Sequence, residues 1–230
     1  MRVSPYKEMR IITGRYKGRH FDVPRTFKAR PTTDFAKENI FNVLTGYLDF
    51  EGATALDLFS GTGSITLELL SRGCSQVVSV EQDRDHHRFI CECVKKLNLS
   101  PALPKGKGDG PSPSERSGEV LPLRGDVFRF IKSCKQQFDF IFADPPYALK
   151  ELPTIPDLIL GTAVARSAMP LDSSTNPLSA NPSPFTLHPS LLKEDGIFVF
   201  EHGKDYDFSQ HPNFVEHRSY GSVNFSIFRR

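Results

Sequence analysis

Runs of β-forming residues alternate with amphipathic helical patterns from residue 53 to residue 201, and this alternation restricts the fold more than any other feature. Strands are expected at 53–59, 76–81, 120–124, 138–143 and 196–201, with helices at about 64–72, 85–97 and 127–135. Strands separated by helices form a mostly parallel sheet, because a parallel pair needs a long crossover connection. We therefore predict an α/β fold: a doubly wound sheet that ends in an antiparallel hairpin at 213–229.

The strand expected at 138–143 runs into Asp144, Pro145, Pro146 and Tyr147. The two prolines stop the chain from continuing as helix or sheet, so a stiff loop should leave the carboxyl end of this strand. The loop presents a carboxylate, backbone carbonyls and an aromatic ring. Acceptors beside a stacking face suit a planar group with an exocyclic amine, such as a nucleobase. Taken alone, the tetrapeptide is explained equally well as a structural turn.

A loop with two glycines, Ser60 to Gly63, follows the strand expected at 53–59 and is called the glycine loop below. Its glycines let the backbone turn sharply and let a ligand approach closely. The loop lacks the Gly-Lys-Ser/Thr of a P-loop, and Thr66 stands where a dinucleotide motif has its third glycine. The candidate cofactor-binding residues of this segment are Asp57, Phe59, Ser60, Gly61 and Gly63.

Acidic residues follow two further strands. Glu81 ends the strand at 76–81, where an acid can accept hydrogen bonds from the ribose hydroxyls of an adenosine ligand. Asp126 follows the strand at 120–124 and could receive an adenine amino group, although helix capping explains it better when it is taken singly. Because the carboxyl ends of parallel strands meet at one edge, we expect Asp57, Glu81, Asp126 and Asp144 around one ligand site.

Basic residues gather at the N-terminus. The formal net charge is +2, whereas residues 1–30 hold nine lysines and arginines against two acids. Segments 10–13 and 19–23 are typical of two short strands around a glycine-bounded turn, so we expect a folded hairpin arm over 1–30. A folded basic hairpin favours contact with nucleic-acid phosphates over a merely solvated tail. The candidate RNA contacts are Arg10, Arg15, Arg19, Arg30 and Lys37.

The rest of the chain, 31–230, should form the main domain. Segments 100–118 and 168–190 are rich in Pro and Ser and are expected to be flexible insertions without site residues. No apolar run approaches the ~18 residues of a membrane span, and residues 1–10 lack a signal-peptide pattern. We therefore expect a cytoplasmic protein, and nothing in the sequence demands more than a monomer. The four cysteines have no C-x-x-C spacing, so no metal site is predicted.

Together these residues resemble the class I, Rossmann-like S-adenosylmethionine-dependent methyltransferases. More narrowly, the chain is similar to the bacterial guanine-N2 methyltransferases of small-subunit 16S ribosomal RNA. The narrow resemblance rests on three stretches: 10–14 with 18–19, 30–34 with Glu38, Phe41 and Asn42, and 57–63. The chain departs from the family's pattern just after 30–34, where Phe35 and Lys37 stand in place of the usual arginines.

The resemblance implies S-adenosylmethionine as cofactor, held by the glycine loop, Glu81 and Asp126. It implies 16S rRNA as partner, within a small subunit or an assembly intermediate. Asp144 and the Pro145 carbonyl would accept hydrogen bonds from the target amine, while Tyr147 would stack on the base.

Two alternatives remain open on the sequence. An adenine-N6 methyltransferase acting on DNA or RNA would share the Asp-Pro-Pro-Tyr loop, and only the N-terminal stretches argue against it. A catalytically idle RNA-binding assembly factor could keep the fold, but complete glycine and Asp-Pro-Pro-Tyr loops argue against that explanation.

Overall fold

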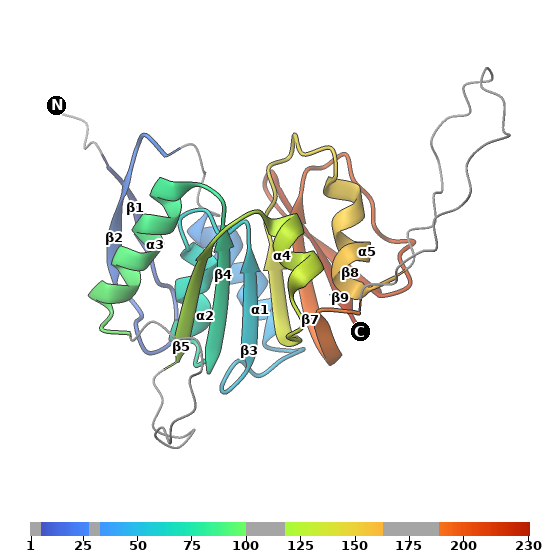
Figure 1. The fold of residues 1–230 in the computed structure, drawn as a ribbon, viewed down its shortest axis with the longest axis horizontal. Helices are drawn as coiled ribbons and strands as arrows, with labels where there is room; N and C mark the ends of the chain where they lie inside the picture. The colour runs from blue at the N-terminus through green and yellow to red at the C-terminus, as the bar shows by residue number, and fades with distance from the viewer. Residues whose placement is uncertain (1–5, 28–32, 100–117, 163–188) are drawn as a thin grey trace, which may run out of the picture.

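The computed structural model describes residues 6–27, 33–99, 118–162 and 189–230. Arg30 and almost all of the two expected insertions lie outside these ranges. Within them, a seven-stranded sheet has the order β5-β4-β3-β6-β7-β9-β8 (Figure 1). The strands are β3 (Thr54–Leu58), β4 (Gln76–Glu81), β5 (Glu119–Arg124), β6 (Phe138–Ala143), β7 (Leu192–His202), β8 (Phe214–Tyr220) and β9 (Val223–Arg229). Strands β3 to β7 are parallel and β8–β9 form an antiparallel hairpin, which confirms the predicted fold class.

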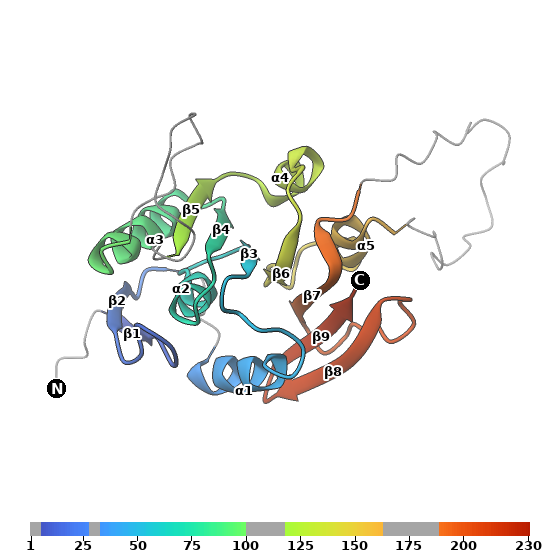
Figure 2. The ribbon, with the colours of Figure 1, turned by 90° about the horizontal axis from the view of Figure 1, so that it is seen from below.

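Helices cover both faces of the sheet (Figure 2). One face carries α1 (Asp34–Leu44), α2 (Ser64–Ser71) and α3 (Arg84–Lys96), and the other carries α4 (Val127–Ser133) and α5 (Ile155–Leu160). Successive strand residues alternate between the two layers: Ala55 packs in the first cluster and Leu56 in the second. Because both faces are buried, the central strands are mostly apolar.

The segment that follows the Asp-Pro-Pro-Tyr loop forms a short helix. A 3-10 turn, η2 (Leu152–Thr154), leads into α5, which ends at Gly161. Gly161 has a left-handed φ of 69°, a conformation that closes a helix at low cost for glycine. None of the described helices is long and apolar enough to cross a membrane.

The winding of the sheet reverses beside β3. The chain first adds β4 and β5 on one side of β3, and β6 then returns to pair with its other side, with Ala55 opposite Phe140. In open parallel sheets, ligands bind outside the carboxyl ends of the strands at such a switch point. The glycine loop after β3 and the Asp-Pro-Pro-Tyr loop after β6 are therefore neighbours.

The N-terminal arm is an antiparallel hairpin of β1 (Tyr6–Arg10) and β2 (His20–Pro24), as predicted, but its first strand ends where the expected one began. The reason is a competing acceptor, because the backbone N–H groups of Ile12 and Thr13 donate to the Glu68 carboxylate of α2. Residues of both strands share one hydrophobic cluster with α1 and α2. The proposed division of the chain at residue 30 falls outside the described residues and stays a prediction.

Candidate active site

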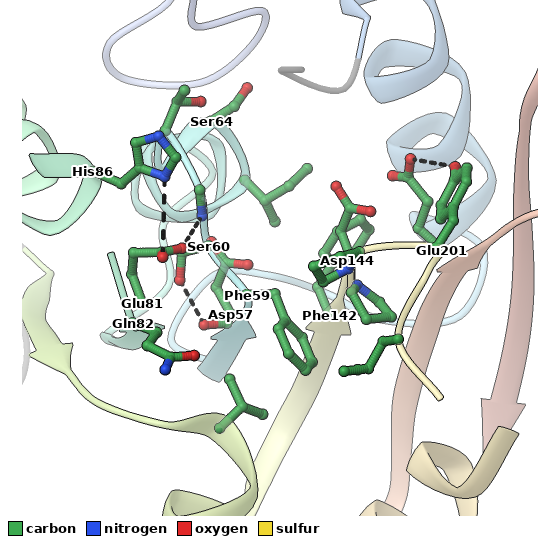
Figure 3. A pocket seen from close by; sticks show the side chains of 18 of the residues that line it. Asp57, Phe59, Ser60, Ser64, Glu81, Gln82, His86, Phe142, Asp144 and Glu201 are labelled. Carbon is green, nitrogen blue, oxygen red and sulfur yellow. Dashed lines mark hydrogen bonds and ion pairs between the residues drawn. The ribbon is translucent and has the colours of Figure 1, made fainter. Parts of the chain in front are cut away.

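A cavity of about 680 Å³ lies at the carboxyl ends of the parallel strands, between the loops that follow β3 and β6 (Figure 3). This volume is within the range typical of small-ligand sites. Its lining contains Asp57, Phe59, Ser60, Gly61, Glu81, Asp126, Asp144, Pro145, Pro146 and Tyr147. Gly63 lies behind the lining at the start of α2, where φ is 74° and a Cβ would stand 2.8 Å from Ile90. The structure thus brings together the predicted cofactor and base residues.

Asp57 ends up at the bottom of this cavity, almost fully buried. Its Oδ2 accepts hydrogen bonds from the Thr66 backbone N–H at 3.0 Å and the Thr66 hydroxyl at 2.5 Å. The carboxylate therefore fixes the first turn of α2 against the end of β3. Burial raises the pKa of Asp57 to about 7, although the Thr66 hydrogen bonds oppose that rise.

The raised pKa of Asp57 predicts how stability depends on pH. Between its ordinary value near 4 and about 7, the folded cofactor-free protein holds a proton on Asp57 that the unfolded chain has lost. Stability from this group is therefore full below pH 4 and is lost as pH rises to 7, by up to about 4 kcal/mol. Urea unfolding at several pH values should show a shallower decline for Asp57→Asn than for the wild type. If the free energy of unfolding of the two proteins depends on pH in the same way, the pKa of Asp57 is not raised in the folded state.

Glu81 holds the glycine loop in place. Its Oε2 accepts the Gly61 backbone N–H and its Oε1 accepts that of Asp83, both at 2.7 Å. The Ser60 hydroxyl donates to the Asp57 carbonyl at 2.8 Å, which pins the loop to the end of β3. These contacts preorganise the segment that a ligand would approach.

Phe59 adopts a conformation that a non-glycine residue rarely takes, with a φ of 58°. Such local strain persists only where the surroundings enforce it, and it is commonest at functional sites. The result is that the ring of Phe59 lines the cavity, at a steep angle to Phe128 with 6.3 Å between ring centroids. These two rings form an apolar wall beside Asp126. Asp126 caps α4 by accepting the Arg129 N–H at 2.9 Å, so its capping role and its place in the lining coexist.

The opposite side of the cavity holds a pair of carboxylates, Asp144 and Glu201 (Figure 3). Burial, followed by the nearby charges of Glu201 and Asp57, raises the pKa of Asp144 well above its ordinary value. The Tyr147 hydroxyl donates to Glu201 Oε1 at 3.3 Å, which holds a ring that is 44% exposed at the rim of the cavity. This side of the cavity therefore offers a hydrogen-bond acceptor, Asp144, whose protonation is shifted by its surroundings, next to the ring of Tyr147, which Glu201 holds in place.

Several lining residues were not predicted, notably Glu201, Gln82, His86 and Phe128. Glu201 ends the expected strand at 196–201, so the rule applied to the other strand-end acids would have found it. His86 stands 4.0 Å from the Glu81 carboxylate, and its ring packs on Phe27 of the arm at 4.4 Å between centroids. That contact joins segments far apart in the chain, and no local pattern predicts it.

Four of the five basic candidates fall into three groups. Arg15 and Arg19 are exposed in the turn of the arm. Arg10 is half-exposed and its Nε donates to Asp34 at 2.7 Å. Arg30 lies outside the described residues.

The expectation that Lys37 contacts RNA is contradicted. Lys37 is fully buried, and its Nζ donates to the Arg10 carbonyl at 2.7 Å and the Ser64 hydroxyl at 3.0 Å. The Glu68 carboxylate lies 3.8 Å away, and burial lowers the pKa of the lysine. Position 37 lies on the inward face of α1 beside Ala36, Ile40 and Phe41, so its ammonium cannot reach a solvent-side partner.

The chain is similar to one protein family and to several proteins named as rRNA methyltransferases. The family model described as conserved hypothetical protein 95 matches residues 9–169. "Putative rRNA methyltransferase YlbH" of Bacillus subtilis (strain 168) is 28% identical over 225 residues, 96% of this chain and 99% of YlbH. Ribosomal RNA small subunit methyltransferase D is 27% identical over 140 residues in Escherichia coli (strain K12), and the match spans 61% of either chain. Its Haemophilus influenzae counterpart is 33% identical over 142 residues, 61% of this chain and 64% of that protein.

Solved structures share the fold. The yhhF structure from Escherichia coli has a TM-score of 0.66 at 21% identity and covers 97% of this chain and 98% of its own. The 16S rRNA N2 methyltransferase RsmC of T. thermophilus, solved with AdoMet and guanosine, has a TM-score of 0.59 at 15% identity, covering 98% of this chain and 50% of RsmC. Together with the named relatives, these similarities confirm the predicted resemblance and the methyltransferase fold.

Proposed function

The chain belongs to the conserved hypothetical protein 95 family, and on that premise we propose that it methylates the exocyclic N2 amine of a guanine in 16S ribosomal RNA. Relatives named as rRNA methyltransferases support the reaction class. The observation that carries the proposal is that one cavity is lined both by the Glu81-bound glycine loop and by the Asp-Pro-Pro-Tyr loop. The relatives named as rRNA methyltransferases come from bacteria, and on that ground we propose a cytoplasmic location for the activity.

The cavity suits S-adenosylmethionine as cofactor. It is large enough, and acidic residues at opposite sides complement a ligand with an ammonium and a sulfonium group. In this proposal Glu81 accepts hydrogen bonds from the ribose hydroxyls, and the wall of Phe59 and Phe128 beside Asp126 holds the adenine ring. When bound, the cofactor supplies an electrophilic methyl group.

The residues of the chain would orient and activate the amine. The lone pair of the guanine amine is delocalised into the ring, so the nitrogen is a poor nucleophile. A hydrogen bond from its N–H to Asp144, assisted by the Pro145 carbonyl, would favour a pyramidal nitrogen with an accessible lone pair. Tyr147, held by Glu201, would stack on the base and keep it in line, so that much of the rate comes from orientation. The base must be out of its stack to enter the cavity.

Transfer of labelled methyl groups from S-adenosylmethionine tests the proposal. The acceptors are unmodified small ribosomal subunits, naked 16S rRNA and duplex DNA. Label that digests to N2-methylguanosine supports the proposal and identifies the assembly state that is modified. Label in N6-methyladenosine would assign the chain to the adenine-N6 enzymes, and cofactor binding without transfer to any RNA would favour the idle assembly factor.

Replacing Glu81 by alanine should weaken cofactor binding. The carboxylate would accept charge-assisted hydrogen bonds from the ligand, and it holds Gly61 in place, so we expect the dissociation constant to rise about 10- to 150-fold. Calorimetric titration measures it, with Glu92→Ala on the exposed side of α3 as a matched control. An unchanged affinity in Glu81→Ala would remove Glu81 from the binding site.

The exposed arginines of the arm should contribute to the salt dependence of RNA binding. If Arg15 or Arg19 pairs with an RNA phosphate, its replacement by alanine should flatten the slope of log affinity against log salt by about 0.7–0.9. Filter binding across a salt series measures this slope, and Lys132→Ala on α4 serves as a control of equal charge. If both arm variants keep the wild-type slope, the arm is a solvated surface.

A further inference from the structure

A second aromatic feature is formed by Phe35 of α1 and Tyr220 of β8, whose neighbours in sequence line the cavity. Phe35 is 66% exposed, and among the described residues only Tyr147 and Val215 are other exposed large hydrophobic side chains. An isolated exposed apolar residue is common and needs no explanation. Phe35 is not isolated, because its ring meets Tyr220 nearly perpendicularly with 6.2 Å between centroids. The two residues lie on α1 and β8, which run side by side (Figure 2).

Residues close to this pair in sequence line the active-site cavity. Thr33, two residues before Phe35, lines the cavity, and so do Ser222 and Val223, which follow Tyr220. Folding brings these segments together from opposite ends of the chain. Of the three exposed large hydrophobic side chains in the described part of the chain, Tyr147 lines the cavity and Phe35 is two residues from the lining residue Thr33.

The chemistry of this aromatic pair favours an unpaired base as the occupant. An edge-to-face pair leaves at least one ring face uncovered, and every nucleobase has a π-face that can stack on such a ring. Beside Phe35, Asp34 holds the Arg10 guanidinium, and two residues from Tyr220 the half-exposed Arg218 pairs with Glu216. Each of these arginines keeps about half of its side chain exposed beside its carboxylate partner, so its guanidinium can still approach a phosphate next to the stacked base.

We infer that Phe35 and Tyr220 form a stacking platform for an unpaired base next to the methylated guanine. The inference rests on the proposed rRNA methylation, because a base that leaves its stack deprives its neighbour of a stacking partner. The platform would replace that partner and hold the RNA strand while the target base is in the cavity.

Kinetics test the platform. Phe35→Ala should raise KM for 16S rRNA transcribed in vitro by about 5- to 150-fold, the range for losing one stacked base. The value of kcat and the S-adenosylmethionine dissociation constant should stay within about twofold of wild type. Phe35→Tyr should keep a normal KM, whereas Phe35→Leu, which keeps apolar area without a π-face, should behave like Phe35→Ala. Val215→Ala removes another exposed apolar side chain from β8 and should leave KM unchanged.

Fluorescence tests direct contact. The chain contains no tryptophan, so Phe35→Trp places a single indole on the platform. Its emission should be quenched by short oligoadenylate and not by an abasic strand of the same length. Quenching without methyl transfer would support the platform and contradict the proposed function. N2-methylation without quenching would support the proposed function and contradict the platform. A normal KM for Phe35→Leu would overturn base stacking, as would a dimer in solution that Phe35→Ala dissociates.

Discussion

Alanine in place of Asp144 should lower kcat by two to four orders of magnitude, with S-adenosylmethionine affinity within about fivefold of wild type. The carboxylate lies in the cavity at the end of β6, where burial and the charge of Glu201 raise its pKa. Its loss removes the acceptor for the target amine but leaves the glycine loop and Glu81 untouched. Single-turnover transfer to 16S rRNA and calorimetric titration of the cofactor measure the two effects separately.

Asp144→Asn separates two possible roles of this residue. The amide keeps an acceptor oxygen but cannot take a proton, so it should retain more activity than Asp144→Ala if hydrogen bonding suffices. The rate of wild-type enzyme should rise with pH as Asp144 ionises, and this dependence should vanish in Asp144→Asn. Glu194→Gln, at an exposed position of β7, is the matched control. Near-wild-type turnover in Asp144→Ala would refute the assignment of the site.

Replacing Glu68 by glutamine should lower the free energy of unfolding by about 3–5 kcal/mol. The buried Glu68 carboxylate accepts the N–H groups of Ile12 and Thr13 and the Nε of Arg72, and it faces the ammonium of Lys37. An amide has one acceptor oxygen for these donors and leaves the buried lysine with only Asp34, 4.0 Å away, as a counter-charge. Urea unfolding measures the loss, and amide exchange at Ile12 and Thr13 should show that the arm opens first.

Two comparisons make this stability prediction specific. Lys37→Met should cost less than Glu68→Gln, because Glu68 keeps Arg72 and both backbone donors. Glu92→Gln makes the same chemical change at an exposed helical position and should be nearly neutral. Equal losses for Glu68→Gln and Glu92→Gln would show that the buried network contributes nothing.

The sequence predicted the sheet and the meeting of the strand-end acids because both depend on local patterns. A run such as Phe138 to Ala143, stopped by Pro145, specifies a strand and the place where it ends without knowledge of its neighbours. Once the strands are parallel, their carboxyl ends must share an edge, so Asp57 and Asp144 must converge. Glu201 obeys the same rule.

The errors came from residues whose surroundings are set by tertiary packing. Lys37 belongs by charge to the basic candidates, yet its position on α1 directs it inward, where Glu68 stabilises it. The first strand of the arm likewise ends early because Glu68, more than fifty residues away in sequence, competes for backbone donors. The local sequence around residue 12 or residue 37 contains no pattern that predicts contact with a carboxylate buried in α2.

The reversal of winding beside β3 has a consequence for the lifetime of the protein. The proposed cofactor would touch loops from both halves of the sheet, so it would bind only when the pairing of β3 with β6 is complete. A ligand that binds only the folded chain stabilises it by about 2.7 kcal/mol at a concentration of 100 times its dissociation constant. A cell depleted of the methyl donor would therefore hold a protein that unfolds and is degraded more often, which links enzyme abundance to the nutritional supply of methionine.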